Sequence, residues 1–246
     1  MNVYWSYLAS NDFTKETQNH GADLLLERPT NVINDINKNN HIRSEAYLRY
    51  IKCPAYPEFF KNVYAIKCDT DFTLQHKIVN EIATLTTDNS QEFFDDAFSI
   101  REYTKDQQLI QMNWNWMLFS DSDIDVSVMP AFLHDNNFVR NTTILPGKMN
   151  ISKWFRPIQP AYIIHDDIEV KTGDVLFYIK IHTKDKIDLK HFDMSKKLKS
   201  LSNECLGLKN FKPNLRFSKI YEIFTKRNYN KKILKEIKKN LTGDFK

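Results

Sequence analysis

The sequence predicts a mainly β protein with peripheral helices, an α+β class with a β-sandwich or jelly-roll-like core and a helical C-terminal appendage. Short β-branched and aromatic segments recur between residues 108 and 192, and turn residues separate them. After Phe192 the apolar residues change to helical spacing. We therefore expect a β-rich domain with short helices over residues 1–192 and a basic helical appendage over 193–246 that packs on it.

The first strands are predicted by β-branched and aromatic runs. They cover residues 3–8 and 63–68, and another begins at Phe72. The turn at 69–71 makes the last two a candidate hairpin.

Two short helices are predicted in the same half of the chain. One contains Val32, Ile33 and Ile36, and the other covers residues 90–98 with Ser90 as its N-cap. Between them, Pro54 and its neighbour Pro57 predict an extended or turned segment, because each proline restricts itself and the residue before it.

The middle of the chain carries the strongest strand patterns. The run 109–119 predicts one long strand with Trp114 and Trp116 on the same side. Apolar and polar residues then alternate with a period of two up to Pro130, which predicts a strand with one solvated face. The alternating residues are Asp123, Ile124, Asp125, Val126, Ser127 and Val128.

Further turns and strands follow up to residue 182. The Leu-Pro-Gly sequence at 145–147 predicts a type II turn. Strands are predicted over 162–164, 168–170 and 175–182, with a turn at 171–174. Beyond them, helical spacing covers 194–206 and 217–241, and residues 228–230 separate two helices.

Charge is distributed unevenly along the chain. Residues 184–246 contain 18 Lys and Arg against 7 Asp and Glu, a net charge of +11, whereas the whole chain carries +4. The remaining residues therefore carry −7. An acidic body with a basic C-terminal quarter is the clearest compositional feature.

Several classes of protein are disfavoured by the composition. No stretch of 18 apolar residues predicts a membrane-spanning helix, and the start lacks the pattern of a secretion signal. The cysteines Cys53, Cys68 and Cys205 are scattered, which favours free thiols in a reducing cytoplasm. Five glycines and the absence of the relevant motifs disfavour phosphate-loop, dinucleotide-binding and serine-nucleophile enzymes, and no catalytic residue is assigned.

One spacing suggests a metal centre. His165 and Asp167 have the H-x-D spacing in which a histidine and a carboxylate share an iron, and His182 would be the second histidine of a cupin or 2-oxoglutarate oxygenase site. Only 17 residues separate the two histidines, and no arginine lies between His182 and Arg216 to bind a co-substrate carboxylate. A polar turn between two strands is the alternative that we favour.

The acidic series at Asp121, Asp123 and Asp125 resembles the start of a calcium loop. It lacks the glycine and the glutamate that such a loop needs. The alternation with apolar residues explains the spacing better, as the solvated face of a strand.

The most distinctive segment is Lys153, Trp154, Phe155 and Arg156. Cations beside aromatic rings can together bind a nucleobase, a sugar or a peptide. The alternative is that Trp154 closes one end of the core while Arg156 pairs with an acidic strand end.

The basic C-terminal helices suggest a second binding surface. A set of lysines there could neutralise the phosphates of a nucleic acid, and such binding would depend on salt. These residues are Lys231, Lys232, Lys235, Lys238 and Lys239. The alternative is a solvated face of a helix that packs on the body through Ile233, Leu234 and Ile237.

Several short motifs resemble one group of proteins. They are Cys53-Pro54-Ala55, Lys61-Asn62, the segment from Pro146 to Pro157 and the strand from Gly173 to Tyr178. Over residues 53–183 the chain resembles uncharacterised proteins of T4-like marine tailed phages, and it is more distantly similar to bacterial β-sandwich domains of unknown function. The resemblance implies a phage origin and a β-rich fold, with no activity attached.

The function that we expect from the sequence is non-enzymatic: a cytoplasmic binding or assembly protein of phage or viral origin. Its partner would be a protein or a small ligand, and residues 153–156 would make the contact. The alternatives are an iron-dependent oxygenase-like enzyme and a nucleic-acid-binding accessory protein. The sequence selects no oligomeric state, although an exposed edge strand could form a dimer.

Overall fold

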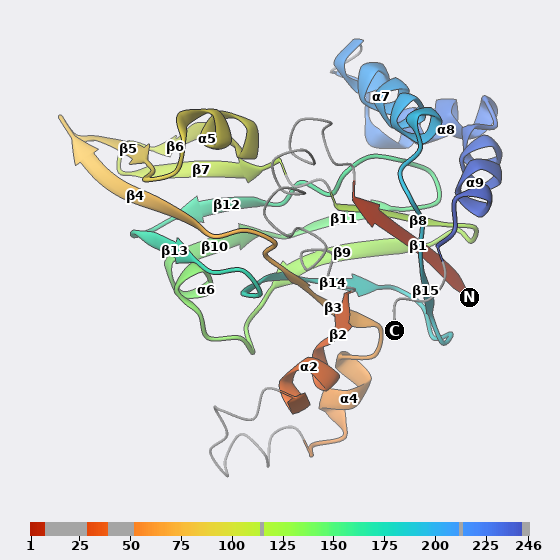
Figure 1. Cartoon of the computed structure of the whole chain (residues 1–246), viewed down its shortest axis with the longest axis horizontal. Coiled ribbons are helices and arrows are strands. Elements are labelled where there is room, and N and C mark those ends of the chain that lie inside the picture. The colour runs from red at the N-terminus through yellow and green to blue at the C-terminus, as the bar shows by residue number, and fades with distance from the viewer. Residues whose placement is uncertain (8–28, 39–51, 114–115, 212–213, 243–246) are drawn as a thin grey trace.

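The computed structural model describes residues 1–7, 29–38, 52–113, 116–211 and 214–242, and Figure 1 shows their arrangement. Strands form the centre of the molecule, and three helices form a layer at the C-terminal end. The prediction of a mainly β core with peripheral helices and a helical C-terminal appendage is confirmed. No helix in these ranges is both long and apolar enough to cross a membrane.

The largest sheet has five strands in the order β11-β9-β14-β3-β2, and all its pairs are antiparallel. The strands are β2 (Thr30–Asn31), β3 (Val63–Lys67), β9 (Asp125–Pro130), β11 (Gly147–Asn150) and β14 (Val175–Ile181). In β9 the buried residues alternate with less buried ones and the strand ends at Pro130, as the period of two predicts. In β14 only Lys180 escapes full burial, because apolar clusters cover both faces of the strand: Phe177 belongs to one cluster and Tyr178 to another.

A second sheet has four strands in the order β10-β12-β7-β6. These strands are β6 (Phe98–Thr104), β7 (Gln107–Met112), β10 (Thr142–Leu145) and β12 (Ala161–Ile164). Buried side chains of this sheet and of the largest sheet belong to one hydrophobic cluster, so the two sheets enclose the main core between them. In this cluster, Ile110 and Tyr162 come from the four-stranded sheet, and Val126 and Phe177 come from the five-stranded sheet.

A third sheet, in the order β13-β4-β5, extends from the core as an arm. It consists of β4 (Phe72–Val79), β5 (Ile82–Thr86) and β13 (Ile168–Val170). Phe72 and Leu74 begin β4 inside the main core, whereas its last three residues are exposed. We call the two hairpins β4–β5 and β6–β7 together the wing; they lie side by side, since the Ala83 amide donates to the Lys105 carbonyl at 2.8 Å.

The fourth sheet, β15-β1-β8, connects the β core with the helices. It contains β1 (Asn2–Tyr7), β8 (Trp116–Ser120) and β15 (Asp188–His191), and β1 pairs with β15 in parallel. Trp5 and Trp116 stack with their ring centroids 5.4 Å apart on one face. The other face presents Tyr4 and Phe119 to the C-terminal helices.

The C-terminal helices are α7 (Lys196–Phe211), α8 (Phe217–Lys226) and α9 (Tyr229–Lys239). We call them the helical layer. Each contributes buried apolar residues to a second cluster, including Leu198 of α7, Phe224 of α8 and Ile237 of α9. Asn228 separates α8 from α9 in a left-handed conformation, at the break that the sequence predicts.

Four short helices lie among the strands. They are α2 (Val32–Lys38), α4 (Ala55–Phe59), α5 (Gln91–Ala97) and α6 (Asn137–Asn141). The predictions of α2 and α5 are confirmed, and the Ser90 hydroxyl accepts a hydrogen bond from the Phe93 amide, as an N-cap does.

The segment around Pro54 and Pro57, predicted as extended or turned, is the short helix α4 with turns on both sides. Pro57 lies in the first turn of this helix, where the missing N–H would have no partner within the helix. The prediction of a type II turn at 145–147 is wrong. Gly147 does not adopt the positive φ of a type II turn, and Pro146 simply separates β10 from β11, which belong to different sheets.

Two predictions about strands are also wrong. The strands β3 and β4 do not form a hairpin, because β3 pairs with β14 and β4 pairs with β5. The run 109–119 is two strands, β7 and β8, in different sheets, and Trp114 lies outside the described residues.

Candidate functional site

The aromatic residues of the 153–156 segment are buried, which corrects their prediction as surface contacts. Trp154 is 4% exposed and Phe155 fully buried, and both lie between the sheet β15-β1-β8 and the helical layer. The Trp154 ring packs against Phe224 of α8, and Phe155 packs edge-on against Phe119 of β8. The alternative of a core position is the one that the structure supports.

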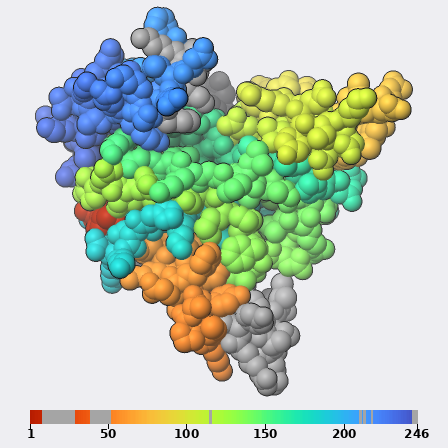
Figure 2. Space-filling model, turned by 180° about the vertical axis from the view of Figure 1, so that it is seen from behind, coloured from red at the N-terminus to blue at the C-terminus, as the bar shows by residue number. Residues whose placement is uncertain are grey.

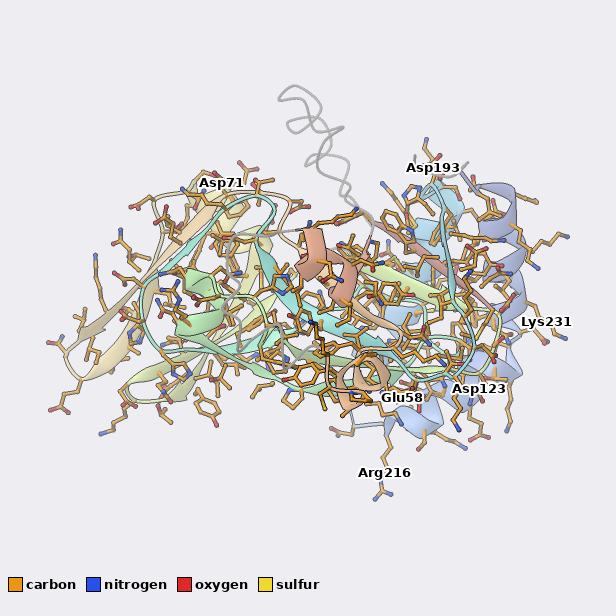
Figure 3. All side chains as sticks on the ribbon, turned by 90° about the horizontal axis from the view of Figure 1, so that it is seen from below. Glu58, Asp71, Asp123, Asp193, Arg216 and Lys231 are labelled. Atoms are coloured by element: carbon orange, nitrogen blue, oxygen red, sulfur yellow. The ribbon has the colours of Figure 1, made fainter. Side chains whose placement is uncertain are left out.

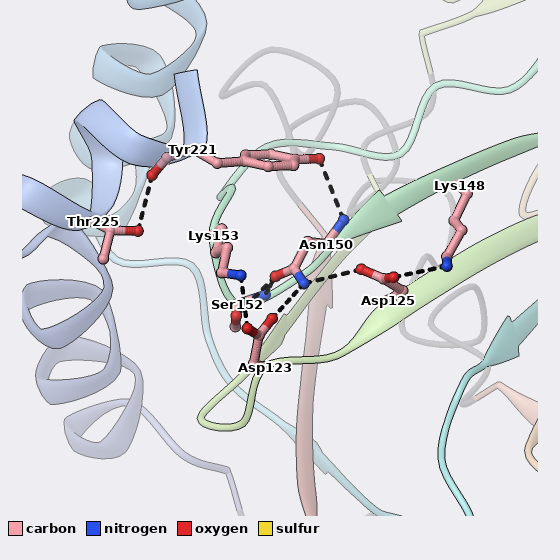
Figure 4. A network of polar contacts seen from close by, with 8 residues as sticks. All are labelled: Asp123, Asp125, Lys148, Asn150, Ser152, Lys153, Tyr221 and Thr225. Atoms are coloured by element: carbon pink, nitrogen blue, oxygen red, sulfur yellow. Dashed lines mark hydrogen bonds and ion pairs between the residues drawn. The ribbon is translucent and has the colours of Figure 1, made fainter. Parts of the chain in front are cut away.

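Lys153 belongs to a polar network that anchors the same segment (Figure 4). Its Nζ donates to Asp123 Oδ2 at 2.6 Å, and the buried Asn150 amide donates to both Asp123 Oδ1 and Asp125 Oδ1. The Asn150 backbone N–H donates to the hydroxyl of Tyr221 on α8 at 3.3 Å. The network therefore fastens β9 and β11 to the helical layer.

Two residues of the acidic series, Asp123 and Asp125, take part in this network. Hydrogen bonds from Lys153 and Asn150 lower the pKa of Asp123, and a hydrogen bond from Lys148 lowers that of Asp125. Each of these two carboxylates thus forms an ion pair with a lysine.

Arg156 is partly buried, and the desolvation lowers its pKa. Its guanidinium donates at 3.4 Å to the Pro157 carbonyl and at 3.4 Å to Gln159 Oε1. No ion pair joins it to a carboxylate among the residues that the structure describes, so the predicted pairing with an acidic strand end is not seen.

The three residues of the iron-site alternative do not come together. His165 follows β12 in the second sheet, where its ring nitrogens meet the Gln107 amide at 3.1 Å and the Thr143 hydroxyl at 2.7 Å. Asp167 accepts from the His76 amide, and His182, at the end of β14 in the largest sheet, meets Ser127. Within the described ranges no three His, Cys, Asp or Glu side chains are placed to hold a metal. The structure therefore does not support the iron-site alternative: His165 and Asp167 lie on the polar segment between β12 and β13, whereas His182 follows β14 of another sheet.

The lysines of α9 form one exposed face. Helical spacing places Lys231, Lys235 and Lys238 together, with Lys232 and Lys239 beside them. All five are exposed, whereas Ile233 and Ile237 on the opposite face are fully buried. Lys231 is directed away from the body at the helical end of the molecule (Figure 3).

Acidic residues neutralise only part of this layer. Glu222 of α8 is bound by Lys219 at 2.8 Å and Lys226 at 2.5 Å, which lower its pKa to about 2. Glu236 of α9 is bound by Lys197 and Lys239. No ion pair with a described carboxylate involves the remaining lysines of α9, which are Lys231, Lys232, Lys235 and Lys238.

The exposed apolar end of the wing was not predicted. Ile78 is 60% exposed, Val79 52% and Ile82 53%, around the turn of the β4–β5 hairpin. Asn80, a turn-favouring residue close to two short apolar pairs, is the signal that would have located it. Figure 2 shows that the wing extends beyond the body at the end opposite the helical layer.

No family model matches the sequence, and no protein of curated function is significantly similar to it.

Proposed function

We propose that this chain is a non-enzymatic binding protein that holds a nucleic acid on the helical layer. The observation that carries the proposal is the row of exposed lysines on α9 that no described carboxylate neutralises. Binding is thereby assigned to the helical layer instead of residues 153–156. The expected cytoplasmic location suits such a ligand, and the resemblance to tailed-phage proteins stays a prediction.

Charge and shape both support a polyanion as the ligand. Residues 196–239 contain 14 Lys and Arg against 3 Asp and Glu, and two of those acids are already bound by pairs of lysines. An ion bound at one lysine would gain little at an exposed site, because water screens it. A chain of phosphates contacts several lysines at once and releases its condensed counterions, which makes the free energy of binding favourable.

The test is the affinity for fluorescently labelled single- and double-stranded DNA, measured by anisotropy between about 50 and about 200 mM salt. We expect binding that weakens steeply as salt rises. The triple variant Lys231→Gln, Lys235→Gln, Lys238→Gln should bind more weakly and lower the slope of log affinity against log salt by up to about 3 for double-stranded DNA.

A matched control removes the same charge elsewhere. Lys61, Lys184 and Lys186 are exposed and lie outside the helical layer. Their joint replacement by Gln should leave the slope nearly unchanged, and melting curves should show both variants folded. Equal losses in the two variants would reduce the effect to net charge and overturn the proposal. Binding to vesicles of anionic lipid without binding to DNA would also overturn it.

A further inference from the structure

Arg156 carries a partly buried positive charge with no carboxylate beside it among the described residues. Its guanidinium donates to the Pro157 carbonyl and to Gln159 Oε1, both neutral oxygens at 3.4 Å, which is long for such a hydrogen bond. Buried charges in proteins are normally paired, because removing an unpaired charge from water is costly. The position of Arg156 therefore favours an anion that comes from outside the chain.

The side chains of Trp154 and Arg156 face the same helix. Phe155, between them in sequence, packs edge-on against Phe119 of β8. Trp154 instead packs against α8, with its ring centroid 6.5 Å from that of Tyr221, and the Tyr221 phenol also acts electrostatically on Arg156. This alternation is typical of extended backbone, in which side chains two residues apart share one side. Trp154 and Arg156 therefore both lie toward Tyr221.

A second donor on this side of the segment also has no partner. The Trp154 indole N–H is buried, and no described residue places an acceptor within hydrogen-bond distance of it. A buried N–H without an acceptor costs free energy, and such groups are uncommon in folded proteins. Two donor groups on one side of a segment, one of them charged, match the acceptor oxygens of an anion.

The guanidinium lies where three parts of the fold meet. Pro157, next to it in sequence, forms a bridge with Met117 of β8. Gln159 reaches the Asn113 side chain, just beyond the end of β7, at 3.5 Å, and α8 supplies Tyr221. The polar side chains there are thus amides and a phenol, which can donate hydrogen bonds to an anion without repelling it.

Lys153, in the same segment, does have a counter-ion (Figure 4). Its Nζ lies 2.6 Å from Asp123 Oδ2, and Asp125 is likewise paired with Lys148. Both acids of this network are therefore already matched by lysines, and neither pairs with Arg156.

We propose that Arg156 binds the carboxylate or phosphate group of a ligand, with the Trp154 indole N–H as a second donor. Arginine suits such a group because its planar fork can donate two parallel hydrogen bonds to one oxyanion. The ligand supplies the missing negative charge, so its binding should stabilise the folded chain. The site uses none of the lysines of α9, and this inference does not depend on nucleic-acid binding there.

The test is an NMR titration of the full chain with sodium phosphate and, separately, with sodium acetate, each compared with sodium chloride at equal ionic strength. We expect the Arg156 Nε–H and Trp154 Nε1–H resonances to shift and saturate with at least one oxyanion and to stay in place with chloride. The Nε–H of Arg101, exposed on β6, is the internal control and should not shift. No saturable shift at Arg156 with either oxyanion overturns the proposal. A shift at Arg156 alone overturns the role of Trp154.

Substitutions at Arg156 test the site a second time. Arg156→Gln should weaken the binding of the oxyanion at least about tenfold, measured at the Trp154 N–H, and Arg156→Lys should also weaken it because the fork is lost. Arg101→Gln is the matched control and should leave the affinity unchanged, and melting curves check that all variants are folded. Equal affinity in wild type and Arg156→Gln overturns the proposal.

A DNA oligonucleotide distinguishes the two sources of a phosphate. If the phosphate belongs to a nucleic acid, DNA should shift the Arg156 resonance, and Arg156→Gln should lower the salt slope of DNA binding by about 1. If the group belongs to a small ligand, DNA should leave the Arg156 resonance in place while free phosphate or acetate shifts it.

Discussion

Asp35 is the most completely enclosed carboxylate in the described residues, at 3% exposure. Its Oδ1 lies 3.2 Å from Lys67 Nζ, and its Oδ2 lies 2.9 Å from His134 Nε2. The other ring nitrogen of His134 lies 2.6 Å from the hydroxyl of the buried Tyr178. These contacts attach α2 to β3 and β14 through one charged group.

The free energy of unfolding should depend on pH through the Asp35 carboxylate. Burial raises the pKa of Asp35, but the hydrogen bond from His134 and the charge of Lys67 outweigh it, so the pKa lies below its usual value. The carboxylate then stabilises the fold above its unfolded pKa, and this contribution is lost as pH falls through the folded pKa.

The corresponding variant is Asp35→Asn. At about pH 6 it should lower the free energy of unfolding by about 2 kcal/mol, because Lys67 and His134 lose the contact with the Asp35 carboxylate. Urea unfolding at a series of pH values should show the gap between wild type and variant shrinking toward about pH 3. A gap that does not change with pH would contradict this role.

The sequence could not predict this network, and it predicted the burial of Trp154 only as one of two alternatives. Asp35, Lys67 and His134 lie far apart in the chain, and only the pairing of distant strands brings them together. The Lys153–Arg156 segment could not be resolved for a similar reason, because the local sequence does not distinguish an exposed aromatic residue from a buried one. The exposed lysines of α9 were predictable, since helical spacing alone separates them from Ile233 and Ile237.

Among the elements, the β4–β5 turn carries measurable strain. A type I′ turn favours glycine at its second central position, and here that position holds Glu81 with φ 64°. A residue with a Cβ pays about 1 kcal/mol for a left-handed conformation.

Glu81→Gly should therefore stabilise the hairpin by about 0.5–1 kcal/mol, measured by chemical unfolding. Glu81→Ala removes the same carboxylate but retains the Cβ, so it should show little gain. Equal stabilisation by both variants would point to the charge and contradict the strain.

Strand positions were easier to predict than strand partners. The alternation of apolar and polar residues in β9 predicts one buried face, and this pattern lies within the strand itself. The partner of β3 is not local: a turn at 69–71 suggested β4, but β3 pairs with β14, more than a hundred residues later. Likewise the alternation of apolar residues with Gln111, Asn113 and Asn115 continues to Trp116, past the end of β7 at Met112, so no change in the pattern marks the break between the two strands.

For the whole molecule, the helical layer and the β core depend on each other. The apolar cluster between them contains Tyr4, Met117, Phe119, Phe155 and Phe192 from the body, all nearly inaccessible. Burying each such side chain contributes about 1.5–3 kcal/mol, and together they rival the net stability of a typical domain. The appendage is therefore part of one folding unit.

A chain ending at residue 192 should show this dependence. Because the apolar face of β1 and β8 would meet water, we expect it to bind a hydrophobic dye, scatter light through aggregation and lose a cooperative melting transition. A truncated chain that is monomeric and melts cooperatively would show instead that the β core folds alone.

The placement of the wing and the helical layer at opposite ends of the long axis has a consequence for assembly. A nucleic acid held on the helical layer would leave the wing uncovered at the far end of the molecule. The molecule could therefore keep a second contact at the wing without either contact blocking the other.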